Sequence, residues 1–318
     1  MPTVSVIMPA YNVASYIAAA MDSALGQTFD DLEVVVVNDG STDDTPAIVS
    51  RYTARDDRVR LLHQTNGGIS VARNTALRVA RGQYFALLDA DDVWDPEYLA
   101  EQMAIFRARP DVSIVTGNAV NLGGLLTGQP ARPWPDPRPE PTLQTMLADE
   151  EAVFIMSIFS RRVYEQIGGF DETIRSNEDY DYWLRASLAG FRFARNDKPL
   201  GEYRRRSDSV SACDARMVRG ILHILRKIRP MLHEYPAEQA VLDRQVQRFE
   251  VELLAAEARS AIERADFESA AANLAALHAR RPRAAVALAR LMVHWTPSLL
   301  SRIYGFRRAR HALGARLS

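Results

Sequence analysis

The sequence has little cysteine and no long uninterrupted apolar segment. Its one cysteine, Cys213, excludes an internal disulfide and a zinc site built from cysteines, and it favours a reducing compartment. The N-terminal residues lack the basic start and the apolar stretch of a secretory signal. No run of 18 or more apolar residues occurs, because Arg290 interrupts the most apolar late segment, 284–293. These absences predict a cytoplasmic protein that does not span a membrane.

Acidic residues are also absent from the end of the chain. The 318 residues carry a net charge of −1, but nine arginines and no Asp or Glu follow Glu268. The near-neutral total argues against a nucleic-acid binder. The basic end fits peripheral docking on the inner face of a membrane, through anionic phospholipid, and it also fits a solvated helical end. Its mixture of apolar and basic residues suits a homodimer interface as well.

Short apolar runs alternate with helical patterns over the first 120 residues. The predicted strands are 4–8, 33–37, 59–62 and 84–88, and the predicted helices between them are 14–25, 43–54 and 69–80. Continuous apolar strands joined by amphipathic helices are typical of a parallel sheet that is covered on both faces. Ligands of such sheets bind beyond the carboxyl ends of the strands, where polar clusters occur here.

The rest of the chain is divided by proline and by helical pattern. Two adjacent glycines and six prolines predict a loop at 123–141. Beyond about residue 213 the pattern is helical, and 255–293 indicates a helical hairpin broken near Pro282. We therefore expect an α/β domain over 1–211 and a helical region over 212–318.

Three carboxylates in four residues follow the fourth predicted strand: Asp89, Asp91 and Asp92. Carboxylates this close raise one another's pKa unless a cation is present. Mg²⁺ or Mn²⁺ binds through one or two carboxylates and keeps its other positions for water and phosphate oxygens. The alternative is a helix cap, for which Asp92 or Asp95 is suitably placed. A cap would not explain Asp89 and Asp91.

Three further clusters carry polar groups suited to a ligand. Asp39 ends the second strand before a glycine, where it could bind a pyrimidine or a ribose, or form a plain turn. Arg73, near the start of a helix, could reach a diphosphate or be structural. Glu178 and Asp179 could simply favour a helix N-terminus. Trp183 follows Asp179 by one turn, and an acid beside an aromatic ring suits a sugar hydroxyl.

Taken together and in this order, these elements resemble the inverting glycosyltransferases of family 2, which have the GT-A fold. The resemblance covers about residues 3–211. It rests on the motifs 4–12 (VSVIMPAYN), 38–43 (NDGSTD), 68–74 (GISVARN), 89–92 (DADD), 168–172 (GGFDE) and 178–179 (ED). It implies a Rossmann-like, mostly parallel sheet with helices on both faces, and the helical pattern beyond about residue 213 adds an all-helical appendage.

The resemblance also implies a donor site for a nucleotide sugar, with UDP favoured. Pro9, Tyr11 and Asp39 would line the pocket for base and ribose, with Asp39 at the uracil. Arg73 would lie near the diphosphate, and Asp89 would face the ribose or the sugar. The donor half of the domain would be about 1–120.

The acceptor side and the chemistry follow from the same resemblance. Asp91 would hold the divalent metal, and Asp179 would be the general base. Glu178 and Trp183 would shape the site for a saccharide or glycolipid acceptor in the acceptor half, about 121–211. The implied reaction is inverting transfer of a hexose, as in bacterial polysaccharide and cell-envelope synthesis, with the loop 123–141 as a lid or acceptor wall.

One departure from the family pattern concerns Arg206, which stands where many members carry a histidine near the metal. Because arginine is not a metal ligand, we predict no protein ligand there, although Arg206 could clamp phosphate.

Three other functions fit the sequence less well. A sugar-1-phosphate nucleotidyltransferase would need a basic glycine-rich loop after the first strand. A metal-independent transferase would lack the acidic triplet. A catalytically inactive carbohydrate-binding or scaffolding subunit would have lost the metal acid or the base, and both are present.

Overall fold

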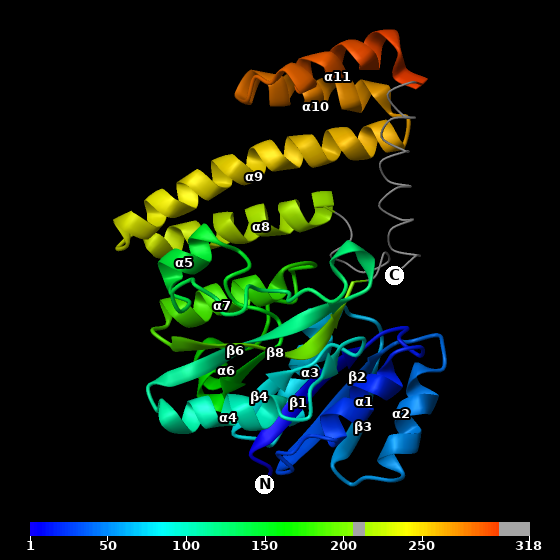
Figure 1. Ribbon diagram of the computed structural model, residues 1–318, viewed down its shortest axis with the longest axis vertical. Coiled ribbons are helices and arrows are strands. Elements are labelled where there is room, and N and C mark those ends of the chain that lie inside the picture. The colour runs from blue at the N-terminus through cyan, green and yellow to red at the C-terminus, as the bar shows by residue number, and fades with distance from the viewer. Residues whose placement is uncertain (206–213, 299–318) are drawn as a thin grey trace. The chain divides into compact units, whose positions relative to one another are not determined.

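The computed structural model describes residues 1–205 and 214–298 (Figure 1). The chain forms two compact units. The first contains residues 1–122 and 128–204, and the second contains 123–127 and the residues from 205 onward. The boundary predicted at residue 211 lies outside the described residues.

An eight-stranded sheet forms the centre of the first unit, in the order β3-β2-β1-β4-β7-β6-β8-β5. The first four strands are mutually parallel, and β6 is parallel to β8. Two strands are antiparallel to their neighbours: β7 to β4 and β6, and β5 to β8. The strands are β1 (Val4–Ala10), β2 (Leu32–Asp39), β3 (Val59–Gln64), β4 (Tyr84–Leu87), β5 (Val93–Trp94), β6 (Val112–Leu122), β7 (Ser157–Ser160) and β8 (Arg192–Arg204).

Helices cover this sheet, which confirms the predicted α/β class. The helices of the first unit are α1 (Ile17–Leu25), α2 (Thr45–Thr53), α3 (Ile69–Val79), α4 (Tyr98–Ala108), α5 (Leu143–Ala148), α6 (Arg161–Ile167) and α7 (Glu178–Leu188). Helix α1 begins three residues later than predicted. Asn12, Val13 and Ala14 donate their backbone N–H groups to side chains of the loop 41–45, and the Val13 carbonyl accepts hydrogen bonds from the Tyr16 and Ile17 N–H groups in a turn that leads into the helix.

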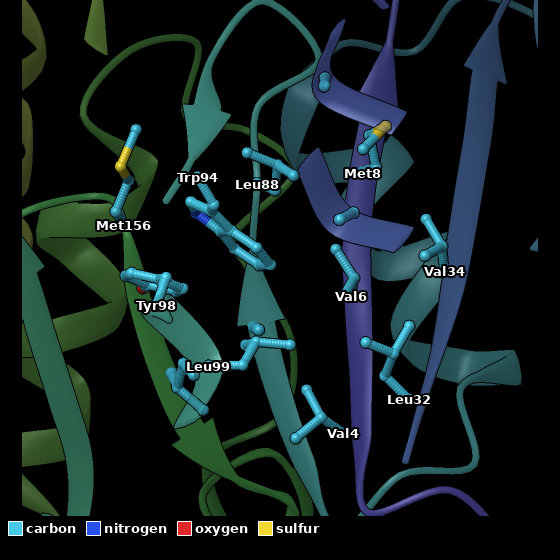
Figure 2. Close-up of a cluster of buried hydrophobic side chains, with 14 of the residues drawn as sticks. Val4, Val6, Met8, Leu32, Val34, Leu88, Trp94, Tyr98, Leu99 and Met156 are labelled. Carbon is cyan, nitrogen blue, oxygen red and sulfur yellow. The ribbon is translucent and has the colours of Figure 1, made fainter. Parts of the chain in front are cut away.

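The core of the first unit follows from the alternation of side chains along its strands. Val4, Val6 and Met8 of β1 are fully buried and point to one face (Figure 2). On that face they belong to one apolar cluster with side chains of α1 and α4, such as Met21 and Leu99. Every strand residue of β2 is buried as well. The continuous apolar runs in the sequence therefore reflect strands that contact protein on both faces.

The loop predicted at 123–141 is confirmed, since its only regular features are the short 3₁₀ turn η1 (Gly124–Leu126) and an isolated β-bridge between Pro130 and Val120. The second unit is helical in its described part, with α8 (Asp214–Ile228), η3 (Arg229–Leu232), α9 (Pro236–Glu263), α10 (Phe267–Arg280) and α11 (Ala284–Trp295). Across residues 1–205 and 214–298, we find no helix with the length and apolar character needed to cross a membrane.

The predicted hairpin 255–293 has the expected break at Pro282 but also a second one that the sequence prediction missed. Between α9 and α10, Ala265 adopts a left-handed conformation with φ of 58°. Asp266 then caps α10, because its side chain accepts a hydrogen bond from the Ser269 N–H at 3.1 Å. An Asp three residues before a Ser in an otherwise alanine-rich helical pattern was the available signal.

A buried carboxylate joins the amino ends of the parallel strands. Glu33 of β2 is 1% exposed and accepts hydrogen bonds from the Ser5 hydroxyl (2.7 Å) and from the Arg81 N–H (2.6 Å). Arg81 and Arg60 add guanidinium contacts to its second oxygen. Burial alone would raise the pKa of Glu33, but these hydrogen bonds outweigh it and hold the pKa below its ordinary value. Glu33 thus connects β1, β2, β3 and the turn before β4.

We expect Glu33→Ala to destabilise the protein by about 3 kcal/mol, because it leaves two arginines and a serine without their buried partner. Urea denaturation at neutral pH would measure the change. The difference from wild type should shrink as the pH falls below the ordinary glutamate value, since the wild type loses this contribution when Glu33 is protonated. Asp57→Ala, at an exposed carboxylate before β3, is the matched control and should change stability by less than about 0.5 kcal/mol.

Candidate active site

The polar loops of the first unit gather where β1, β2 and β4 end. The loop after β1 is fixed to the loop after β2 through Asn12, which adopts a positive φ of 50°. Its side-chain oxygen accepts a hydrogen bond from the Thr42 N–H at 2.8 Å, and its own N–H binds the Ser41 hydroxyl. Tyr11 is 50% exposed beside this contact, and Pro9 is half-buried. An exposed ring on a fixed loop is available to stack on a flat ligand.

Asp39, at the end of β2, is 2% exposed and organises the loop before α3. One of its carboxylate oxygens accepts hydrogen bonds from the Gln64 amide (2.7 Å) and the Gly67 N–H (2.8 Å). The other accepts one from the Gly68 N–H at 2.9 Å. Gly40 has a φ of 73°, and a Cβ there would lie 2.8 Å from the Asn66 nitrogen, so this turn requires glycine. Asp39 keeps unused acceptor capacity on its second oxygen.

The acidic cluster forms a tight turn after β4, in which the Asp92 N–H binds the Asp89 carbonyl. Asp92 is 1% exposed, and one of its oxygens accepts the backbone N–H of Arg204 at 2.8 Å. Burial raises the pKa of Asp92 well above its ordinary value, and the charges of Asp89 and Asp91 raise it further. Its other oxygen has no hydrogen-bond partner among the described residues. Asp89 and Asp91 remain partly exposed.

Arg204 also contacts this turn, and the sequence alone does not predict that contact. It lies at the end of β8, where its Nε donates to the Asp91 carbonyl at 2.9 Å. Its guanidinium lies 4.8 Å from the ring centre of Tyr16. In the sequence, the one hint of a role for Arg204 is that it lies two residues before Arg206. Arg206 itself lies outside the described residues.

Arg73 connects the acidic turn to α7. Its guanidinium is almost fully buried and forms ion pairs with Asp89, at 2.7 Å, and with Glu178. It also lies 5.4 Å from the ring centre of Phe170. Because two carboxylates already engage this guanidinium, its geometry is that of a residue that positions Asp89 and Glu178.

Two of the sequence motifs meet beside this arginine. The Asn74 amide donates to the Phe170 carbonyl and accepts the Phe170 N–H, both at 2.8 Å. A side chain on Gly169 would collide with Asn74, which explains the glycine there. The motifs 68–74 and 168–172, about 100 residues apart in the sequence, are thus held together by hydrogen bonds next to Arg73.

Asp179 follows Glu178 at the start of α7 and is partly exposed. Desolvation raises the pKa of Asp179 to about 7, and the neighbouring charge of Glu178 raises it too. The Arg73 guanidinium and the Tyr180 N–H act in the opposite direction, and Asp89 adds a smaller increase. The result is a carboxyl group that exchanges its proton near neutral pH.

Trp183 does not lie in the acceptor site predicted from the sequence. Its side chain is 1% exposed and packs edge-on against Phe159, Tyr182 and Phe193. Trp183 does follow Asp179 by one helical turn, but its position on α7 directs its side chain toward the core. The structure therefore gives Trp183 a packing role under α7 instead of the predicted contact with an acceptor.

The oxygen atoms of the acidic turn fit a divalent cation whose coordination shell also includes oxygen atoms of a bound ligand. Among residues 1–205 and 214–298, no group of three or more His, Cys, Asp or Glu side chains is arranged to hold a metal by itself. Mg²⁺ and Mn²⁺ sites that also bind phosphate need only one or two carboxylates. The partly exposed Asp91 supplies hard oxygen atoms of this kind, and the unpartnered oxygen of Asp92 lies in the same turn.

Comparison with known proteins identifies the family. Residues 5–168 match the sequence profile described as "Glycosyl transferase family 2". The chain is 36% identical to the chondroitin synthase of Escherichia coli over 193 residues. This aligned region covers 59% of the chain. It spans only 27% of the length of that relative.

Among the solved structures with a similar fold are two that hold a nucleotide sugar. Staphylococcus aureus TarS, in complex with UDP-GlcNAc, matches with a TM-score of 0.66 and 22% identity over 96% of this chain and 89% of that one. The mannosyltransferase PcManGT of Pyrobaculum calidifontis, in complex with GDP-Man and Mn²⁺, matches with a TM-score of 0.63 and 22% identity over 99% and 86%. The fold is that of the GT-A glycosyltransferases. Because the family profile covers more than half of its length, this chain belongs to glycosyltransferase family 2 and is a transferase.

Proposed function

We propose that this glycosyltransferase moves a hexose from a nucleoside-diphosphate donor, a UDP-sugar, to a hydroxyl of a saccharide or lipid-linked acceptor, with inversion at the anomeric carbon. The observation that carries the proposal is the charged cluster around Arg73. It joins Asp89 of the acidic turn to Glu178, next to a carboxyl group with a pKa of about 7. Groups suited to a charged donor and a group suited to accept a proton thus share one site.

Asp179 is the proposed general base. Its carboxylate takes the proton of the acceptor hydroxyl while that oxygen forms a bond to the anomeric carbon. The bond from this carbon to the diphosphate oxygen breaks on the opposite side, so the configuration inverts and the nucleoside diphosphate leaves. A base whose pKa lies near the working pH combines a useful deprotonated fraction with a strong affinity for the proton.

The proposed donor pocket uses the loops after β1 and β2. The exposed ring of Tyr11 would stack on the base, with Pro9 beside it. Asp39 would accept the N–H of uracil on the oxygen that now binds only Gly68. Asp89, held by Arg73, would face the ribose or the sugar. The complexes of TarS with UDP-GlcNAc and of PcManGT with GDP-Man agree with a nucleoside-diphosphate sugar as the donor, and the choice of UDP rests on the proposed contact of Asp39 with uracil.

Asp91 is the proposed ligand of a divalent metal, Mn²⁺ or Mg²⁺. When bound, such an ion offsets the charge that develops on the leaving diphosphate. The carboxylate of Asp91 is partly exposed, and Arg204 holds its backbone carbonyl. The Mn²⁺ in the PcManGT complex supports this proposal.

Asp179→Asn should lower the transfer rate by about 10²–10⁴-fold, because the amide cannot accept the proton. Binding of UDP with Mn²⁺, measured by calorimetry, should change little, since the donor-side groups remain. Glu165→Gln, on the exposed side of α6, is the control and should transfer sugar normally. An Asp179→Asn variant that retains full transfer would exclude Asp179 as the base.

The pH dependence of kcat/KM should report the same group. Below about pH 7 the base is protonated, so kcat/KM should fall about tenfold for each further pH unit. Glu178→Gln removes a charge that raises the pKa of Asp179, so the acidic limb of the kcat/KM profile should move to lower pH. A limb that stays in place, or that moves to higher pH, would contradict the assignment.

Asp91→Asn should raise the Mn²⁺ concentration needed for half-maximal transfer by about tenfold or more, because the ion loses a charged ligand. Release of UDP from UDP-sugars at increasing Mn²⁺ would measure this, with GDP- and dTDP-sugars assayed in parallel. Wild-type turnover that is unaffected by EDTA, with no donor preferred, would reject both the metal and the UDP assignment.

A further inference from the structure

Helix α11 has apolar side chains on two opposite faces. On one face, Ala289 and Val293 are buried in a cluster with side chains of α9 and α10. On the other, Leu288, Leu291 and Trp295 are 58%, 59% and 81% exposed. The inner face accounts for the packing of this helix, and the outer one has no such explanation.

The three exposed side chains form a single stripe, which we call the α11 stripe. Their spacing of three and four residues places them within one narrow sector of the helix, roughly opposite the buried face. Single exposed leucines are ordinary on protein surfaces, but a contiguous row that ends in a tryptophan indicates a binding surface.

The charged residues in the segment that contains the stripe are of one sign. Arg281 and Arg283, both exposed, precede α11, and Arg290 lies along its side. No Asp or Glu follows Glu268 anywhere in the sequence, which carries nine arginines after that point. Between Arg280 and Ser298 the described chain has four arginines and no Asp or Glu, and an apolar helix face in so basic a segment complements a surface that is apolar within and anionic at its edge.

We propose that α11 docks on an anionic phospholipid bilayer, with the α11 stripe in the boundary between headgroups and acyl chains and the neighbouring arginines at the phosphates. A second copy of the chain is the other partner that would cover apolar side chains. A symmetric contact through this face would, however, bring two arginine-rich borders together, and like charges across an interface are unfavourable. The charge pattern therefore favours lipid. This inference does not depend on the proposed reaction.

Sedimentation of the full chain with lipid vesicles tests the proposal. Vesicles that contain phosphatidylglycerol should bind the protein, and vesicles of phosphatidylcholine alone should bind it weakly. Binding should decrease with salt, because the arginines contribute through screened charge. Equal binding to both kinds of vesicle, or to neither, would overturn the proposal.

Replacement of the stripe by L288Q/L291Q/W295Q should lower vesicle binding by about tenfold or more. R281Q/R283Q should lower it by about fivefold for each arginine removed. Met231→Gln, at a 45% exposed side chain in η3, is the matched control and should bind as wild type does. Circular dichroism would establish that each variant is folded.

A second measurement needs no change of the stripe. Brominated lipids in phosphatidylglycerol vesicles should quench the fluorescence of Trp295, and W295F should lose that part of the quenching. Sedimentation equilibrium without lipid provides the opposing outcome. A dimer that the stripe variant converts to a monomer, with no quenching in wild type, would assign the α11 stripe to a second copy and refute lipid docking.

Discussion

The candidate site depends on one buried cation, the guanidinium of Arg73. A charge taken out of water is costly unless it is paired, and Arg73 is paired with a carboxylate on each side, Asp89 and Glu178. These partners lie 16 and 105 residues away in the sequence. The pairing therefore fixes the acidic turn after β4 against the start of α7. It also bears directly on the pKa of Asp179, which Arg73 lowers and Glu178 raises.

The sheet brings these distant parts together. Because β1 lies between β2 and β4 and runs parallel to both, the loops that follow all three strands open at the same edge. Glu33 closes the opposite, amino-terminal edge with hydrogen bonds from neighbouring strands. Hydrogen bonds to Glu33 thus fix the amino-terminal end of the parallel strands. The carboxyl-terminal end carries the charged groups of the candidate active site.

Local patterns in the sequence predicted the elements that are periodic and the motifs that follow strands. The strands from β1 to β4 and the helices between them were foreseen, because their apolar periodicity is strong. The direction of β7 and the pairing of Arg204 with Asp91 and Asp92 were not, since both depend on contacts between distant segments. Trp183 shows the same limit: its spacing from Asp179 was evident, but the side of α7 that faces the core is decided by Phe159 and Phe193 on other strands.

The hydrogen bonds of Asp39 have a consequence for how such an enzyme can evolve. The carboxylate proposed to read the base also holds the N–H groups of Gly67 and Gly68, directly before the helix that carries Arg73. A substitution at Asp39 that changed the preferred nucleotide would therefore disturb the support of the reacting centre at the same time. Preference for a base and competence for chemistry would then be inherited together.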